Sequence, residues 1–357
     1  MKRFFSRIQN WLKAEPRVRL LEDLEGREKS DAILHNLFAE SRIPGISITI
    51  TSKEEILLQK GYGYSDMERK VPVDPKKTPF RIASISKCIT AMALGKMVEE
   101  GVIQWDDSFY KHVPYYPKKK YDFTLRQLAA HTAGIRGYRG KEFALNRPYS
   151  IKDSLQVFQN DPLVFEPGMG YLYNSYDFVL LSLAMQEASG IPFENYVQEK
   201  ILIPLGMSDT SLPRKDGYES KRKNPNPQFY TKNTLGFRNA VPVNNFYKLA
   251  GGGYLSTSDD IARLGQAIIK QELLTSATYT ELLSSQTVNG KPTYYGLGFQ
   301  VSQDEYGRPF VGHVGNSVGA YTNFFVYPNE EVVFTALINC SDPNVQQDLD
   351  SSRNLFF

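Results

Sequence analysis

An alternating strand pattern near the N-terminus is the feature that most constrains the fold of this 357-residue chain. Isoleucine alternates with serine or threonine over residues 46–50, and a polar stretch at 52–55 separates this run from a second apolar run at 56–58. Period-two alternation on both sides of a turn is typical of paired strands. The pattern predicts a β-hairpin over residues 43–64.

The same strand pattern returns in the last third of the chain. Three short runs rich in β-branched and aromatic residues stand there, at 295–301, 318–327 and 331–338. Runs of this kind, bounded by turn residues, predict further strands. Strands at both ends of a chain predict one antiparallel sheet built from both termini.

The middle of the chain is mainly helical in its pattern. Residues 84–100 carry apolar side chains at three- and four-residue spacing, and Gly101 follows as a stop signal. Residues 111–249 mix helical segments with proline-containing connections. We therefore predict an α+β fold, with helices flanking the sheet and a mostly helical inserted subdomain.

The predicted domain organisation follows from this order. Residues 1–30 form an N-terminal helical extension, and residues 31–357 form the main domain. Within it, residues 31–110 and 250–357 make the part that contains the sheet, and residues 111–249 make the helical insertion. The polar, basic stretch 213–230 is expected to be a surface loop.

Composition excludes several classes of protein. A net charge of +3 is too small for the concentrated basic face of a nucleic-acid-binding protein. Membrane-spanning helices are not expected, because no run of about 18 apolar residues occurs. Cys88 and Cys340 cannot form a disulfide framework or a cysteine-pair zinc site, and the four histidines form no H-E-x-x-H motif. We expect no cofactor and no metal.

Residues 1–15 have the pattern of a short amphipathic helix. One face would carry Phe4, Ile8, Trp11 and Leu12, with lysines opposite. A surface or docking helix is the favoured interpretation, and peripheral contact with a membrane is the alternative. The segment lacks the apolar core of an intact signal peptide.

The motif Ser84-x-x-Lys87 can carry chemistry. Three residues apart on a helix, the two side chains lie on the same face. A serine hydroxyl becomes a nucleophile when a neighbouring base takes its proton, and a lysine can do so if burial destabilises its ammonium. The alternative is a serine that caps the helix and a lysine that is exposed.

Two later segments add candidate residues. Tyr173 precedes a helical pattern, and its hydroxyl could pass a proton between a lysine and a serine. His313 stands among glycines beside a strand pattern, in Val311-Gly-His-Val-Gly-Asn-Ser-Val-Gly319, and glycines there indicate close approach of a ligand or another backbone. The alternatives are an ordinary half-buried tyrosine and a structural histidine.

In this order, S-x-x-K, tyrosine and H-x-G resemble the serine β-lactamase and penicillin-binding peptidase superfamily, in its class C-like branch. Further landmarks agree with the resemblance: LAAHTAGI at 128–135, IPLGMSDT at 203–210 and LAGGGYLST at 249–257. The similarity runs from about residue 43 to residue 337. It is greatest to mitochondrial β-lactamase-like serine proteases and their bacterial relatives, and it implies a β-lactamase/DD-peptidase-like fold.

The resemblance also implies roles for individual residues. Ser84 would be the acylated nucleophile, Lys87 its base and Tyr173 a second proton carrier. The backbone N–H groups of Ser84 and Asn316, beside Gly315, would form the oxyanion hole.

Two departures from the family pattern affect the expected substrate. His313 stands where many relatives carry a lysine that binds a substrate carboxylate, and a histidine does this weakly near neutral pH. Ser175 stands where the family has an asparagine, and the nearest asparagine, Asn174, is displaced by one position. Both departures disfavour efficient β-lactam hydrolysis and leave acyl transfer intact.

A rival site fits the letters of the G-x-S-x-G nucleophile elbow, at residues 315–319. The elbow needs a helix after its serine and a histidine later in the chain, but a β-rich run follows Ser317 and no histidine does. We therefore reject this site. His131 is interpreted as structural.

The favoured function is a serine hydrolase that acts on a peptide, a D-amino-acid amide or an ester. The alternative is a binding or sensing module, slowly acylated or not at all, for peptidoglycan fragments or a protein partner. The resemblance also allows self-assembly, leaves the oligomeric state open and points to the periplasm or cell envelope.

Overall fold

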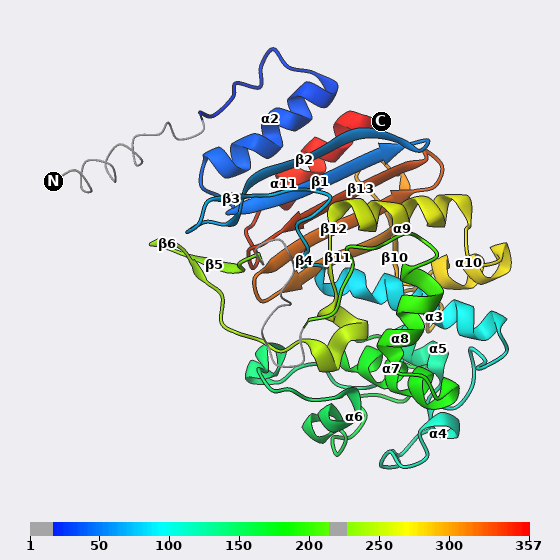
Figure 1. Ribbon diagram of the computed structural model, residues 1–357. Coiled ribbons are helices and arrows are strands. Elements are labelled where there is room, and N and C mark those ends of the chain that lie inside the picture. Colours follow the sequence, from blue (N-terminus) through cyan, green and yellow to red (C-terminus); the bar gives the residue numbers. More distant parts are fainter. Residues whose placement is uncertain (1–16, 214–226) are drawn as a thin grey trace.

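A seven-stranded antiparallel sheet forms the framework of the computed structural model, which describes residues 17–213 and 227–357 (Figure 1). In spatial order its strands are β10 (Gln300–Gln303), β11 (Pro309–Ser317), β12 (Ala320–Tyr327), β13 (Val332–Ile338), β1 (Gly45–Ser52), β2 (Glu55–Asp66) and β3 (Val71–Pro72). The N-terminal hairpin pairs with the C-terminal strands through β1 and β13, where Ile46 lies opposite Ile338. The predicted sheet from both termini is therefore confirmed.

Helices cover both faces of the sheet. On one face lie α2 (Gly26–Ala39) and α11 (Gln346–Arg353), which pack against each other and against alternate residues of β1, β12 and β13 (Figure 1). On the other face lies α9 (Ser258–Lys270), and α10 (Ser276–Leu283) follows it. The alternation in β1 therefore separates two buried faces: its isoleucines meet α2, and Ser47 and Thr49 hydrogen-bond to Ser258 of α9 at 2.7 and 2.9 Å.

The insertion is mainly helical, as predicted. Its helices are α4 (Phe109–His112), α5 (Leu125–Ala129), α6 (Ile151–Ser154), α7 (Tyr176–Ser189) and α8 (Phe193–Val197), with the π-helical turn η4 (Gln198–Leu202) and the 3₁₀ turns η2 (Gly140–Ala144), η3 (Leu155–Val157) and η5 (Phe246–Lys248). Short strand pairs complete the chain: β4 (Phe80–Arg81) with β7 (Leu255–Ser256), β5 (Tyr230–Asn233) with β6 (Gly236–Asn239), and β8 (Thr287–Val288) with β9 (Lys291–Pro292). A 3₁₀ turn, η7 (Asn354–Phe356), ends the chain.

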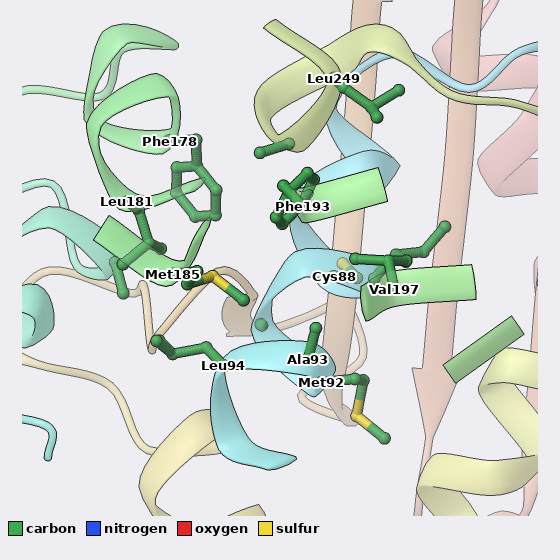
Figure 2. Close-up of a cluster of buried hydrophobic side chains, with 14 of the residues drawn as sticks. Cys88, Met92, Ala93, Leu94, Phe178, Leu181, Met185, Phe193, Val197 and Leu249 are labelled. Atoms are coloured by element: carbon green, nitrogen blue, oxygen red, sulfur yellow. The ribbon is translucent and has the colours of Figure 1, made fainter. Parts of the chain in front are cut away.

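The central helix is α3 (Ser86–Glu99), which follows the 3₁₀ turn η1 (Ala83–Ile85). It packs against α7, α8 and the π-helical turn η6 (Leu249–Gly253). Figure 2 shows apolar side chains from these elements meeting around it, among them Met92 and Phe178. A helix that is apolar on most sides is stable only when it is enclosed, and this enclosure takes Lys87 in its first turn out of water.

Several boundaries differ from those predicted. The strand predicted over 295–301 is wrong for 295–299, because only β10, from Gln300, is a regular strand. Gly298 turns there at a φ of 84° and would place a Cβ only 2.7 Å from Ala91, so the segment packs on α3 instead. Residues 1–16, which include the whole amphipathic helix predicted over 1–15, and residues 214–226 of the predicted surface loop lie outside the described residues. The domain boundary at residue 30 stays a prediction.

Strand β11 packs directly on the turn that carries Ser84. A Cβ at Gly315 would lie 2.3 Å from Thr322 Oγ1 and 2.9 Å from Ala83 Cβ. Such distances require a glycine, because neither the neighbouring strand nor the turn can move without disturbing the sheet. Gly315 therefore sets how closely β11 approaches η1.

We predict that Gly315→Ala destabilises the protein by about 1–3 kcal/mol, since an added methyl overpacks this contact. Urea unfolding of the variant measures the change. Gly137→Ala is the matched control, because its Cβ would meet nothing nearer than Asn174 Cβ at 3.9 Å. Unchanged stability of Gly315→Ala would show that β11 and η1 are not in close contact.

Candidate active site

Three of the candidate residues meet at one point. Lys87 Nζ lies 3.1 Å from Ser84 Oγ and 2.8 Å from the Tyr173 hydroxyl, and the Tyr173 hydroxyl donates to Ser84 Oγ at 2.6 Å. The alternatives of an exposed lysine and an ordinary half-buried tyrosine are therefore wrong. A hydroxyl, an amine and a phenol in mutual contact can exchange a proton without a water molecule between them.

The backbone around Ser84 explains how its side chain is presented. Ser84 lies in η1, one turn before α3, and Ala83 before it has a left-handed φ of 47°. This conformation is rare for a residue with a Cβ, and it persists only where the surrounding structure holds it. The turn directs Ser84 to the cleft and leaves Lys87, on the same helical face, underneath it.

Lys87 is fully buried, and this changes its acidity. Its Nζ donates to the carbonyl oxygen of Gly251 at 2.7 Å, and among the described residues no carboxylate forms an ion pair with it. Burial is the largest cause that lowers the pKa of Lys87 to about 7, and the nearby charge of Lys248 acts in the same direction. A large fraction of the side chain is therefore a neutral amine near neutral pH, with a lone pair available for the serine proton.

Tyr173 comes from the loop that leads into α7. Backbone hydrogen bonds from Gly168 N to Thr132 O and from Leu172 N to His131 O fix this loop at 2.8 and 3.0 Å. The residue is 39% exposed, while its hydroxyl contacts Ser84 and Lys87. Burial of the hydroxyl raises the pKa of Tyr173, so the phenol stays protonated until a base removes its proton.

Behind Tyr173 lies a buried histidine–aspartate pair. His131 Nδ1 lies 2.8 Å from Asp177 Oδ2, and the rings of His131 and Tyr173 are 4.6 Å apart. Burial lowers the pKa of His131 well below its usual value and raises that of Asp177. Burial therefore disfavours the charged form of each group, and the burial of His131, which is 1% exposed, agrees with its structural interpretation.

A cleft of about 420 Å³ opens above Ser84. The sheet side contributes Asn316, Ser317, Val318 and Ser341. The insertion side contributes Tyr138, Phe143, Ser175 and Lys248. The cleft therefore lies between the two parts of the fold, and Ser84 and the glycines at 251 and 252 form its floor.

Ser175, which stands where the family pattern has an asparagine, and its neighbour Asn174 differ in orientation. Ser175 lines the cleft and hydrogen-bonds to Tyr138. Asn174 is 5% exposed and turned inward: its Oδ1 accepts from Asp177 N at 2.8 Å and its amide donates to Asp177 Oδ2 at 2.6 Å. Asn174 therefore stabilises the start of α7 and does not face the cleft.

His313 does not lie where we expected a substrate-binding residue. It is 1% exposed, its Nδ1 lies 2.6 Å from Val314 O, and its Nε2 lies 3.0 Å from the Tyr295 hydroxyl. The carbonyl requires a proton on Nδ1, so Nε2 accepts from Tyr295. Burial lowers the pKa of His313 to about 3, and the neutral ring offers no positive charge to a substrate carboxylate.

The sequence did not identify Tyr138, Phe143 and Lys248 as cleft residues. No chemical motif includes any of the three: Tyr138 lies just after the landmark at 128–135, and Lys248 lies just before the landmark at 249–257. Ser317 of the rejected nucleophile elbow ends β11 and precedes β12, so it lacks the helix that an elbow requires. Among the described residues, no helix is long and apolar enough to span a membrane, and no cluster of three metal-binding side chains occurs.

Three known proteins illustrate what this chain is similar to in sequence and fold. Human "Serine beta-lactamase-like protein LACTB, mitochondrial" is 27% identical, with 85% of this chain and 72% of LACTB covered. An octameric penicillin-binding protein homologue from Pyrococcus abyssi has a TM-score of 0.79 at 26% identity, covering 92% of this chain and 77% of that one. The D-amino acid amidase from Ochrobactrum anthropi, solved with D-phenylalanine, has a TM-score of 0.78 at 19% identity and covers 91% of this chain and 97% of its own.

The family model described as "Beta-lactamase" matches residues 30–355, nearly the whole of the chain. The β-lactamase/DD-peptidase fold that the resemblance implied is therefore confirmed. With its S-x-x-K serine and lysine in contact with a tyrosine at the floor of the cleft, this chain belongs to the β-lactamase family of serine hydrolases.

Proposed function

We propose that the protein hydrolyses a peptide, a D-amino-acid amide or an ester through an acyl-enzyme at Ser84. The mutual contact of Ser84, Lys87 and Tyr173 is the observation that carries this proposal. A neutral Lys87 can donate to Tyr173 and to Gly251 O while its lone pair accepts the proton of Ser84.

The reaction proceeds in two balanced halves. Ser84 Oγ attacks the substrate carbonyl as its proton moves to Lys87, and Tyr173 gives a proton to the departing amine or alcohol and is reprotonated by Lys87. The C–O bond to Ser84 then breaks when a water molecule attacks, with the same groups moving its protons in reverse. The products are a carboxylic acid and the leaving group.

The end of β11 supports an oxyanion site. Strand β10 pairs with β11 only from Pro309 to Gly312, and beyond this point Val314 N donates to Gln300 Oε1 at 3.0 Å. N–H groups two residues apart on a strand point to the same side, so the N–H of Asn316 points past the end of β10, where Asn316 lines the cleft. The N–H of Ser84, in the first turn of a helix, is the second donor of the proposed oxyanion hole.

The substrate class rests on the chemistry of the cleft and on the printed names of similar proteins. A D-amino acid amidase shares the fold, which supports amide hydrolysis. The inward-turned Asn174 and the neutral His313 argue against efficient β-lactam hydrolysis. D-amino-acid amides are bonds of the bacterial cell wall, so the cell envelope remains the expected location.

A binding or sensing module is the second candidate, and intact-mass measurement distinguishes it. After exposure to a fluorophosphonate, the hydrolase should carry one adduct that Ser84→Ala loses.

Lys87→Met should lower the labelling rate by about 10²–10⁴-fold, because the base is gone. The stability of this variant should stay equal or rise, since a buried amine becomes apolar. Normal labelling of Lys87→Met would contradict the assignment of the base, and wild type without an adduct would favour the binding module.

The rate should depend on pH through Lys87. Protonation blocks the lone pair, so kcat/KM for a neutral ester should rise with pH, reach half its maximum near pH 7 and stay level to about pH 9. Lys248, whose pKa is also lowered to about 7, is tested by Lys248→Met. This variant should keep the acidic limb and move its midpoint to higher pH, because the charge of Lys248 lowers the pKa of Lys87. A flat profile, or a rise near pH 4, would contradict a lysine base.

Tyr173→Phe should leave the fold intact and reduce turnover by about 10²-fold, because the departing group loses its proton donor. Pre-steady-state kinetics with an activated ester and an amide test this role. The loss should be larger for the amide, whose leaving nitrogen requires a proton, than for a nitrophenyl ester. Equal losses for the two substrates would assign Tyr173 to positioning instead.

A further inference from the structure

One charged side chain of the cleft has no part in the proposed acyl transfer. Lys248 immediately precedes η6, whose Gly251 carbonyl holds Lys87, and it lines the same 420 Å³ cavity as Ser84. It is only 5% exposed. Among the described residues that line the cavity, Lys248 is the only one with a formal charge.

The contacts of Lys248 leave most of its binding capacity unused. Its Nζ donates to Phe143 O at 2.8 Å and lies 5.4 Å from the centre of the Tyr138 ring. An ammonium has three donors, so two remain available. Among the described residues, no aspartate or glutamate forms an ion pair with it, and burial lowers the pKa of Lys248 to about 7. A buried, unpaired amine of this kind gains free energy when an anion arrives.

The walls of the cavity favour a small monoanion that belongs to a partly apolar molecule. Phe143 and Val318 supply apolar surface, and Ser175 and Tyr138 supply hydroxyls that are already bonded to each other. One lysine balances a carboxylate. Arg81, whose charge also lowers the pKa of Lys248, already donates to Val318 O at 2.8 Å. His313, neutral and turned away, does not compete for this role.

We propose that Lys248 binds a carboxylate of the substrate, so that the enzyme acts on acyl donors that carry a carboxylate in addition to the scissile carbonyl. This inference rests on the proposed acyl transfer at Ser84. Lys248 is then the specificity-determining residue of the cleft, and it does the work that the family resemblance assigned to position 313.

Matched ester pairs test the proposal on both sides of the scissile bond. In the first pair, mono-4-nitrophenyl glutarate carries a carboxylate on its acyl side and 4-nitrophenyl pentanoate is the neutral control. In the second pair, 4-acetoxybenzoate carries the carboxylate on its leaving group and its methyl ester is the neutral control. For each pair, kcat/KM is corrected for spontaneous hydrolysis, and the value for the charged ester is divided by the value for the neutral ester. A general loss of activity lowers both values equally and leaves this ratio unchanged. In at least one pair, Lys248→Met should lower this ratio by about 10- to 100-fold.

Two further variants sharpen the result. Lys248→Arg keeps the positive charge and should retain part of the preference for the charged ester. Lys77→Met removes an exposed lysine whose side chain makes no hydrogen bond or ion pair among the described residues, and it should leave both ratios as in the wild type.

The outcomes separate the two proposals. Fluorophosphonate labelling of Ser84 with equal charged-to-neutral ratios in wild type and Lys248→Met, in both pairs, overturns the role of Lys248 alone. If Lys248→Met does not fold, the wild type still decides, because a wild type that prefers the charged ester in neither pair overturns the inference. Absence of both labelling and hydrolysis overturns the acyl transfer and this inference with it.

Discussion

Burying an amine without an ion-pair partner among the described residues is the constraint on which the proposed catalytic centre depends. Water would stabilise the ammonium of Lys87, and the fold withholds water by enclosing α3 between the sheet and the insertion. The oxygens of Ser84, Tyr173 and Gly251 surround the nitrogen, and they compensate only part of the lost hydration. The packing that stabilises the domain therefore also makes the base.

The neighbouring groups are arranged so that they do not cancel this effect. A charged carboxylate raises the pKa of a nearby lysine, and Asp177 has this effect on Lys87; burial opposes it, because burial raises the pKa of Asp177 and so disfavours its charged form. The histidines His131 and His313 are neutral and pack around Tyr173, with their rings 4.6 and 5.7 Å from it. These buried groups keep Tyr173 in place without adding charge.

The sequence predicted the parts of this site that depend on local spacing. S-x-x-K places serine and lysine on one helical turn wherever the helix lies, and alternation in β1 and β2 defines a hairpin. The sequence could not show which side chains become buried when the sheet and the helical insertion pack together. For this reason His313 was expected to meet substrate although Tyr295 and Val314 occupy both its nitrogens, and Lys248, without any motif, was missed. Burial of single residues is decided by contacts between segments far apart in sequence, which periodicity does not report.

The pairing of β1 with β13 also has a consequence for how the cleft is assembled. Ser84 follows the first hairpin in the chain, whereas β11, which borders its cleft, and β13, which completes the sheet against β1, come much later in the sequence. The cleft therefore exists only after strands far apart in the chain have paired. A fragment that stops before β11 would contain Ser84 without the strand that borders its pocket.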